Sequence, residues 1–359
     1  MAAAVAAARK GAEVTIAESN SRVGKKLLMT GNGRCNLSHL DIKPEDYNGD
    51  TEIVKSVLER FGQTGAFGLF MSMGVLLNSD SSGRVYPYSN SANTVLDALR
   101  EELDSLGVKI FCDTKITAIE RGFTAHGGID ILADRVILTT GGKAQSGSDG
   151  YALAKSLGHS VTELSPSLCG ITADGTLPFK GIRAHAAVTL CDSGKNAVRK
   201  EIGEIQFTEW GLSGICVFDI AGYAKKGDIV IVDLLPDYSE DEAKLLLSAL
   251  DTKRGAASLL GGIMNKRLTK LVKCDGDFDE LAHSAKNIEF TVKGTRSFSD
   301  AQVTKGGIPL DEVGADMQSK KCPGLYFAGE ILDVDGGCGG YNLHWAWASG
   351  VCAGENAAE

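Results

Sequence analysis

At the start of the chain, small and apolar residues follow first a helical pattern and then a strand pattern. Residues 2–10 are almost all alanine or valine, which predicts a helix that Gly11 ends. The following run, residues 12–18, is rich in β-branched and small residues and predicts a short strand ending at Glu18. The chain therefore opens with a helix, a glycine turn and a strand.

Further runs repeat this mixture of helical and strand spacing along the chain. Periodic apolar positions predict helices over 51–74, 91–107 and 148–158, and strands over 108–121 and 129–142. Residues 164–234 are rich in strand patterns, residues 239–285 are helical and charged, and residues 286–298 return to a strand. The order indicates an α/β fold with a β-rich insertion and a helical lobe.

The last fifty residues carry the densest pattern. The segment "GLYFAGE" predicts a strand that ends at Glu330, and Asp333 and Asp335 follow it. Four glycines then lie within residues 336–340, before a helix that begins near Tyr341. A helix N-terminus has free N–H groups and partial positive charge, so it can stabilise an anion there. A glycine loop capped by acids is the plainer alternative.

Composition and charge restrict the classes of function. The chain has 359 residues, enough for two or three domains, and a formal net charge of −9. This charge argues against a nucleic-acid partner, which favours a basic surface. No apolar run reaches membrane-spanning length. The nine cysteines form no C-x-x-C pair and the six histidines no metal-binding pattern, so we expect no metal site and a cytoplasmic location.

Glu18 is the first candidate binding residue. In a nucleotide-binding βαβ unit, an acid about 20 residues after the glycine loop binds the ribose hydroxyls. Glu18 follows a helix, a glycine turn and a strand, which is the expected position. The glycine loop would then precede Met1. A surface acid at the end of an ordinary strand explains Glu18 equally well.

Two glycine-bearing segments are further candidates. "GNGRCN", residues 31–36, allows the backbone to approach a flat ligand, with Arg34 and Asn36 as hydrogen-bonding groups, although a structural turn is the alternative. "VILTTGG" predicts a buried strand that ends in small residues, where a cofactor can cross it. It is not a P-loop, because Ile137 and Ala144 occupy two of that motif's required positions.

Five segments occur together in one order: "RVGKKLLMTGNGRCNLS", "GRVYPYSNSANTVLDAL", "VILTTGGKAQSGSDGYALAKSLGH", "EIQFTEWGLSG" and "GLYFAGEILDVDGGCGGYNLHWAWASG". Together they resemble a bacterial family of NAD(P)/FAD-dependent, aminoacetone-oxidase-like oxidoreductases that includes bile-acid double-bond reductases. The resemblance implies a Rossmann-like FAD-binding domain from residues 1–163 and 306–359. It also implies an inserted β-barrel-like domain, 164–236 and 287–305, and a helical subdomain, 237–286.

The resemblance further implies a set of cofactor-binding residues. They are Glu18 at the adenosine ribose; Arg22, Lys25 and Lys26 near the phosphate and ribityl side; Gly31, Asn32, Gly33, Arg34, Cys35 and Asn36 near the isoalloxazine; Ile116 by the adenine; Thr140, Gly141 and Gly142 along the dinucleotide; and Gly329, Glu330, Asp333, Gly340, Tyr341, Asn342 and Leu343 at the ribityl chain and flavin ring.

The chain departs from the family at its start. Members of the family begin with a strand and a Gly-Gly-Gly-x-x-Gly loop before the helix that begins here at Met1. The missing strand would be central in the sheet, and the missing loop would supply N–H donors to the pyrophosphate. We therefore expect a shortened chain start, or weakened FAD binding.

The expected function is hydride transfer between NAD(P)H or an organic substrate and FAD, including reduction of a C=C bond. We expect a small-molecule substrate and no nucleic-acid or membrane partner. The sequence identifies no catalytic residue. Arg34, Tyr341 and His344 are candidate proton donors near the expected flavin, although a packing role is favoured for His344. Cys35 has no partner cysteine, so a redox role is not favoured for it. A cofactor-poor binding module is the alternative. A fumarate-reductase-type flavoprotein is a third reading, but we find no substrate-binding Arg/His set.

Overall fold

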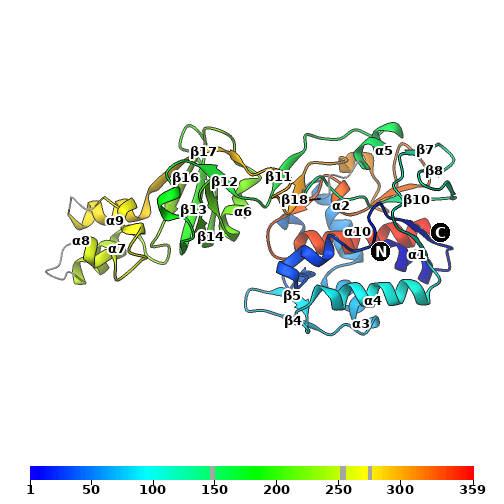
Figure 1. Ribbon diagram of the computed structural model, residues 1–359, viewed down its shortest axis with the longest axis horizontal. Helices are drawn as coiled ribbons and strands as arrows, with labels where there is room; N and C mark the ends of the chain where they lie inside the picture. Colours follow the sequence, from blue (N-terminus) through cyan, green and yellow to red (C-terminus); the bar gives the residue numbers. More distant parts are fainter. Residues whose placement is uncertain (146–149, 251–255, 274–276) are drawn as a thin grey trace. The chain divides into compact units, whose positions relative to one another are not determined.

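The computed structural model describes residues 1–145, 150–250, 256–273 and 277–359 and divides the chain into two compact units (Figure 1). Unit 1 comprises Met1–Ser165 and Val303–Glu359, and unit 2 comprises Pro166–Gln302. Three sequence-based statements fall partly outside the described residues: the start of the predicted helix at 148–149, the helical region at 251–255 and 274–276, and Cys274.

Unit 1 contains the elements that carry the candidate site. Its α-helices are α1 (Ala2–Arg9), α2 (Thr51–Arg60), α3 (Gln63–Ser72), α4 (Ala92–Ser105), α5 (Gly150–Ser156) and α10 (Tyr341–Ala357). Short 3-10 helices are η1 (Leu27–Gly33), η2 (Pro44–Asp46), η5 (Leu310–Glu312) and η6 (Gly329–Ile331).

The strands of unit 1 are short and form several small sheets. They are β1 (Thr15–Ala17), β2 (Ser38–His39), β3 (Tyr47–Asn48), β4 (Leu77–Ser79), β5 (Arg84–Pro87), β6 (Lys109–Phe111), β7 (Ala118–Ile119), β8 (Thr124–His126), β9 (Ile131–Leu132), β10 (Val136–Leu138), β18 (Val303–Lys305), β19 (Leu325–Phe327) and β20 (Asp335–Gly336). β11 (Ser165–Ser167) begins where unit 1 passes into unit 2.

Two parallel strand pairs form the Rossmann-like part of unit 1. β1 pairs with β6, with Ile16 opposite Ile110, and β10 pairs with β19, with Ile137 opposite Tyr326. Within the described residues the two pairs are not hydrogen-bonded to each other. The expected strand and glycine loop before Met1 concern residues outside this sequence, so that expectation stays a prediction.

Helix α10 lies at the centre of the unit 1 core. Trp345, Ala348 and Cys352 are at most 2% exposed, and Figure 1 shows α10 beside α1. The indole N–H of Trp347 donates to the carbonyl oxygen of Leu37 at 3.0 Å, which ties the helix to the segment before β2. Burial along most of its length fixes the N-terminus of α10, where the glycine loop ends.

Unit 2 contains a closed barrel with the strand order β12-β15-β14-β13-β16-β17. The strands are β12 (Ile171–Ala173), β13 (Arg183–Cys191), β14 (Ala197–Phe207), β15 (Gly211–Ser213), β16 (Ile229–Asp233) and β17 (Ile288–Thr295). Alternating residues of β16 and β17 face the buried interior, as a half-exposed strand requires. The barrel closes because β12 pairs with both β15 and β17.

The helices of unit 2 follow the barrel strands in sequence. They are α6 (Ile215–Ala221), α7 (Glu240–Ala249), α8 (Ala256–Leu260) and α9 (Phe278–Lys286), with η3 (Leu177–Phe179) and η4 (Leu268–Leu271). Ser239 caps α7 and forms a capping box with Glu242. The predicted fold class, a Rossmann-like domain with an inserted β-barrel and helical elements, is confirmed. Among the described residues no helix combines the length and apolar character needed to cross a bilayer.

Candidate functional site

The carboxyl ends of β10 and β19 bring two predicted segments to one edge. The strands are parallel with Leu138 opposite Phe327, and Ala328 N–H donates to the carbonyl oxygen of Leu138 at 3.2 Å. Residues 140–142 and 329–330 therefore emerge side by side. This is the edge at which open α/β sheets bind ligands.

Glu330 connects three distant parts of unit 1 at this edge. Its Oε2 lies 2.5 Å from Lys26 Nζ, and its Oε1 accepts from the backbone N–H of Thr304 at 2.8 Å. The Thr304 hydroxyl in turn accepts from Ala144 N–H at 2.9 Å. A Cβ at Gly142 would lie 2.6 Å from Glu330 Oε1, so the structure brings Lys26, Gly142 and Glu330 together. Thr304 was not predicted from the sequence.

The N-terminus of α10 is the second part of the candidate site. Asn342 holds the preceding loop: its Oδ1 accepts from Gly336 N–H at 2.9 Å, and its Nδ2 donates to Gly336 carbonyl oxygen at 2.7 Å. Within the described part of the chain, no acceptor is found for the backbone N–H groups of Asn342 and Leu343. The helix thus presents donors and partial positive charge there.

Asn36 and Gly340 lie directly beside this helix end. A Cβ on Gly340, which has φ +102°, would lie 2.2 Å from Ser38 carbonyl oxygen and 2.8 Å from Asn36 Oδ1. The Asn36 Oδ1 atom is buried and has no hydrogen-bond partner among the described residues. A buried oxygen without a donor is costly in a native protein, and a bound group with an N–H would satisfy it.

The loop that leads to Asn36 has unusual backbone geometry. Gly31, Asn32, Gly33 and Cys35 all have left-handed φ angles, between 55° and 81°. Such angles disfavour ordinary side chains, and clusters of them occur at functional sites. Arg34 lies on the outside, with its guanidinium carbon 4.6 Å from the centre of the Tyr86 ring.

Aromatic and histidine side chains support the start of α10. The Tyr341 ring stacks on His39 with centroids 5.0 Å apart, and Tyr47 donates from its hydroxyl to the Tyr341 carbonyl oxygen at 3.0 Å. His344 Nδ1 lies 3.0 Å from Ser38 Oγ, and burial lowers the pKa of His344 to about 4. His344 is therefore neutral at pH 7, and its complete burial agrees with the favoured packing role. Ser38, His39 and Tyr47 carried no signal in the sequence.

The remaining predicted residues lie outside these two groups or at their margins. Glu18 follows β1 and accepts from the backbone N–H and the side-chain amide of Asn20, both at 2.7 Å. Asp333 accepts from the Thr162 hydroxyl at 2.8 Å, and Gly329 N–H donates to the Ser349 hydroxyl at 2.9 Å. Four further residues are placed as follows: Arg22, Lys25 and Thr140 are exposed, and Ile116 is half-buried against the core.

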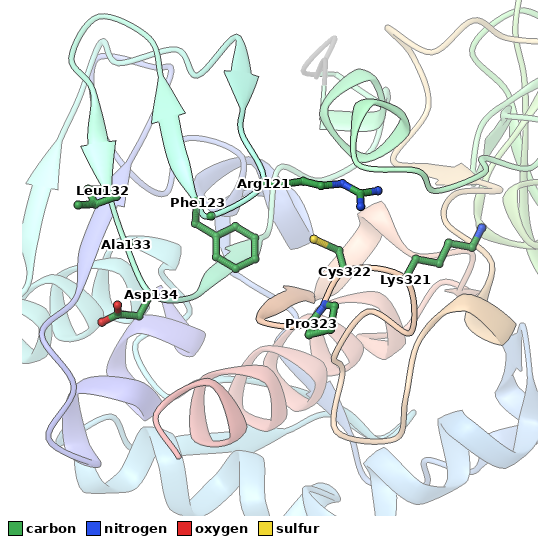
Figure 2. Close-up of a pocket in the computed structure, with 9 residues that line it drawn as sticks. Arg121, Phe123, Leu132, Ala133, Asp134, Lys321, Cys322 and Pro323 are labelled. Carbon is green, nitrogen blue, oxygen red and sulfur yellow. The ribbon is translucent and has the colours of Figure 1, made fainter.

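A surface pocket of about 450 Å³ lies away from these residues (Figure 2). Phe123, Leu132, Lys321 and Cys322 are among its lining, which includes no predicted site residue. Its residues at 132–134 precede β10 and those at 321–323 precede β19, so it lies at the amino ends of the strands that carry the candidate site.

The residues of the candidate site fit the flavin that the resemblance implies. The unpartnered Asn36 oxygen and the free N–H groups at the start of α10 together offer an acceptor and donors for a polar ring. The Lys26–Glu330 pair and Gly142 at the strand ends could hold the attached chain of the cofactor.

Comparison with known proteins finds relatives over nearly the whole chain. A family model described as the HI0933-like protein Rossmann domain matches residues 1–356. The 3-dehydro-bile acid delta(4,6)-reductase of Clostridium scindens is 37% identical, with 99% of this chain and 96% of that protein covered. The ribosomal RNA dihydrouridine synthase of Haemophilus influenzae is 29% identical, with 96% and 93% covered.

A solved structure shares the fold at low identity. The 3-ketosteroid-delta4-(5alpha)-dehydrogenase of Rhodococcus jostii superposes with a TM-score of 0.54 at 16% identity, covering 100% of this chain and 94% of that one. At this identity the likeness concerns the fold alone.

Proposed function

The chain belongs to the HI0933-like family of Rossmann-domain proteins, and from that premise we propose that it is an FAD-dependent reductase of C=C bonds. The reaction adds a hydride and a proton across a C=C bond conjugated to a carbonyl group. The substrate is a small molecule, and NAD(P)H supplies the electrons.

The names of the relatives support this reaction class. One relative is named a bile acid delta(4,6)-reductase, and the other is named for making dihydrouridine. Both names describe the saturation of a C=C bond. The two substrates differ greatly in size, so the shared chemistry is better supported than any one substrate.

The observation that carries the proposal is the junction of Asn36 with the N-terminus of α10. An unpartnered buried amide oxygen faces Gly340, beside free helix N–H groups. FAD, when bound, accepts a hydride from the donor and passes one to the substrate. The N-terminus of α10 would stabilise negative charge on a bound ring, and Asn36 Oδ1 would accept a hydrogen bond from it.

The other predicted residues hold the strand ends and the glycine loop in place. Lys26 and Glu330 anchor the strand ends to η1, and Asn342 fixes the glycine loop through both of its amide atoms. His344 contacts the Ser38 hydroxyl through Nδ1. Because its pKa is lowered to about 4, it is neutral at pH 7 and is not the proton donor of the proposal. Residues of this kind orient a cofactor and restrict its motion.

A cytoplasmic location is part of the proposal. The eight cysteines that the structure describes are all free thiols, which suits a reducing compartment. The net charge of −9 favours a small-molecule substrate over a nucleic acid. The relatives named as RNA-modifying enzymes make ribosomal RNA the second candidate substrate.

The test begins with the cofactor. Purified protein, incubated with FAD and desalted, should be yellow and release FAD on denaturation. With NADH or NADPH it should convert a 3-oxo-4,6-diene bile acid to a product two hydrogens heavier by mass spectrometry. A colourless protein that stays so after incubation with FAD would instead favour the cofactor-poor binding module.

A variant pair links the result to the site. Glu330→Gln should weaken FAD binding by about 10-fold or more, because the charge-assisted bond to Lys26 is lost. Asp41→Asn is the matched control: Asp41 also pairs with a lysine, Lys43, but both side chains are more than half exposed. The control should bind FAD like the wild type.

A further inference from the structure

The pocket that lies away from the candidate cofactor site has both an apolar and a charged lining (Figure 2). Its volume is about 450 Å³, a size that is typical of small-molecule sites. Every lining residue belongs to unit 1, from the turn 121–123, the segment 132–134 and the turn 321–323. The pocket is therefore formed within one compact unit.

The turn that carries Phe123 has an unusual backbone conformation. Gly122 and Phe123 both have left-handed φ angles, of 104° and 64°, and a bulky residue rarely adopts such an angle. The Phe123 N–H donates to the carbonyl oxygen of Glu120 at 2.9 Å, and its carbonyl oxygen accepts from Ala133 N–H at 3.1 Å. A Cβ on Gly324 would lie 2.8 Å from the Phe123 ring, so the ring packs on that glycine. One wall of the pocket is thus fixed by its own contacts.

Buried polar groups fix the second wall. The Ser319 hydroxyl accepts from the backbone N–H groups of Lys321 at 3.0 Å and Cys322 at 2.8 Å. The same Oγ lies 2.8 Å from Nε2 of the buried His159. The Lys321 ammonium lies 2.6 Å from Glu312 Oε1, so its charge is already paired. A pocket with two fixed walls is preorganised, and a ligand that binds there loses little free energy to ordering of the protein.

Arg121 supplies an unpaired positive charge to the pocket. Its side chain is exposed and has no hydrogen-bond or ion-pair partner among the described residues. In Figure 2 the Asp134 carboxylate lies on the far side of Phe123 from Arg121. A guanidinium binds a carboxylate through two parallel N–H donors. One available cation, with an acid elsewhere in the lining, favours a ligand with a single negative charge over a phosphate or a dianion.

Apolar side chains form most of the remaining lining. Leu132 is 79% exposed, the highest value among the large apolar side chains that the structure describes. A lone exposed leucine is ordinary, but this one borders a pocket that also includes Phe123, Ala133 and Pro323. A ligand with an apolar body would remove this surface from water, which contributes free energy in proportion to the area covered.

We propose that this pocket binds an amphipathic monocarboxylate. Arg121 pairs with the carboxylate, and the apolar body lies against Phe123 and Leu132. The site is separate from the candidate cofactor site, because its residues precede β10 and β19 whereas residues 140–142 and 329–330 follow these strands. The proposal involves binding alone and does not depend on the reaction that the protein catalyses.

The test compares a charged probe with a neutral one. The charged probe is 2-naphthoate, and 2-naphthamide has the same rings without the charge. Isothermal titration calorimetry uses the full chain after incubation with FAD. The Kd for 2-naphthoate should be below about 1 mM and at least about 10-fold lower than that for 2-naphthamide, because only the carboxylate forms a charge-assisted pair with Arg121.

Two variants test the two parts of the site. Arg121→Gln should weaken the binding of 2-naphthoate by about 10-fold and change that of 2-naphthamide by less than about 2-fold. Arg100→Gln is the matched control, because Arg100 is also exposed and without a partner in the described part of the chain, but lies in α4 outside the pocket. Leu132→Ala should weaken both probes by about 3-fold, because it removes apolar area and no charge. All three side chains are exposed, so the variants should fold, which thermal melting checks.

Each outcome supports or overturns the proposal. Equal affinity of the wild type for the two probes overturns it, and so does an Arg121→Gln loss no larger than that of Arg100→Gln. Absence of any binding heat at about 5 mM 2-naphthoate also overturns it. The titration is repeated on protein without added FAD. An unchanged Kd supports a separate site, whereas displacement of bound 2-naphthoate by FAD would place the probe in the cofactor site and contradict the proposal.

Discussion

Glu330 receives its partners from parts of the chain that are remote in sequence. Lys26 lies 304 residues away and Thr304 lies 26 residues away. Glu330 stands at the end of a predicted strand before a glycine loop, whereas Lys26 was indicated only by the family resemblance, and their role toward a cofactor stays a prediction. Thr304 could not be predicted, because a threonine in a strand pattern has no distinguishing feature until the fold brings it to Glu330. At this scale the contacts within a site depend on the fold and cannot be predicted from single residues.

Cys35 provides a test at the same scale. It lies in the left-handed loop, is fully buried, and burial raises the pKa of its thiol to about 12. Because the thiolate is the reactive form, Cys35 should be alkylated by iodoacetamide at pH 8 at least about 10-fold more slowly than the half-buried Cys112 and Cys338. Peptide mass spectrometry after timed labelling measures the rates. Labelling of Cys35 as fast as that of Cys338 would contradict this prediction and support a redox role for Cys35.

His159 and Glu312 predict a loss of stability in acid. His159 Nδ1 lies 2.7 Å from Glu312 Oε2, and its Nε2 lies 2.8 Å from Ser319 Oγ. Although burial opposes it, hydrogen bonds from Lys321, Ser160 and His159 lower the pKa of Glu312 from 4.5 to about 2. Its contribution is present above pH 4.5 and is lost as the pH falls toward 2. Burial lowers the pKa of His159 below 6.5, so acid destabilises the fold there too.

Urea unfolding of Glu312→Gln measures this contribution. At pH 7 the variant should lose about 2 kcal/mol in the free energy of unfolding, because the carboxylate loses its charge-assisted bonds from Lys321 and Ser160. The difference from the wild type should shrink below pH 4.5. Glu13→Gln is the control, since Glu13 pairs with Lys109 on the surface and should show no measurable change. A difference that stays constant with pH would exclude the predicted linkage.

Secondary-structure elements were predicted well where the sequence contains its own stop signals. Gly11 and Gly107 follow the ends of α1 and α4, and both have left-handed φ angles. The predicted helical region 51–74 is divided into α2 and α3 around Phe61 and Gly62, because Gly62 starts a new helix. Long strand patterns also break: the run 108–121 contains β6 and β7 only, since the backbone turns at Asp113, where φ is 51°.

Gly340 tests how the glycine loop joins α10. Gly340→Ala should lower the free energy of unfolding by about 2 kcal/mol or more, because the residue has φ +102° and its Cβ would meet Ser38 and Asn36. It should also weaken FAD binding, since Asn36 must move. Gly68→Ala is the matched control in α3, where no atom lies within 4 Å of the added Cβ. The control should be neutral or stabilising by up to about 1 kcal/mol.

The two variants are compared by thermal melting and by titration with FAD. Equal effects of Gly340→Ala and Gly68→Ala would mean that the contacts of Gly340 do not shape the site. A stability loss without any change in FAD binding would mean that Gly340 stabilises the loop but does not shape the cofactor site.

At the scale of the whole molecule, the barrel shows what the sequence leaves undetermined. The strand patterns of unit 2 predicted a β-rich insertion, and closure depends on pairing Ile171 with Thr295, 124 residues apart in sequence. Pairings over such distances depend on register and on the fold of the intervening chain, which periodicity does not specify.

The net charge of the whole chain leads to a prediction about its substrate. The chain carries 46 acidic and 37 basic residues, whereas RNA binding depends on the release of counterions by basic groups. A fluorescent ribosomal RNA fragment at about 0.15 M salt should therefore show no saturable binding below about 100 μM protein. The rate of bile acid reduction should change by less than about 2-fold between low and high salt, because binding of a small molecule releases few counterions.

The relative from Escherichia coli that is named a ribosomal RNA dihydrouridine synthase provides the positive control for this comparison. Both proteins are incubated with NADH or NADPH and unmodified ribosomal RNA, and dihydrouridine is measured by nucleoside mass spectrometry. Only the control protein should produce it. If this chain produces dihydrouridine with a rate that falls steeply with salt, a local basic surface outweighs the net charge. The shared C=C chemistry would then act on RNA, and the small-molecule assignment would be wrong.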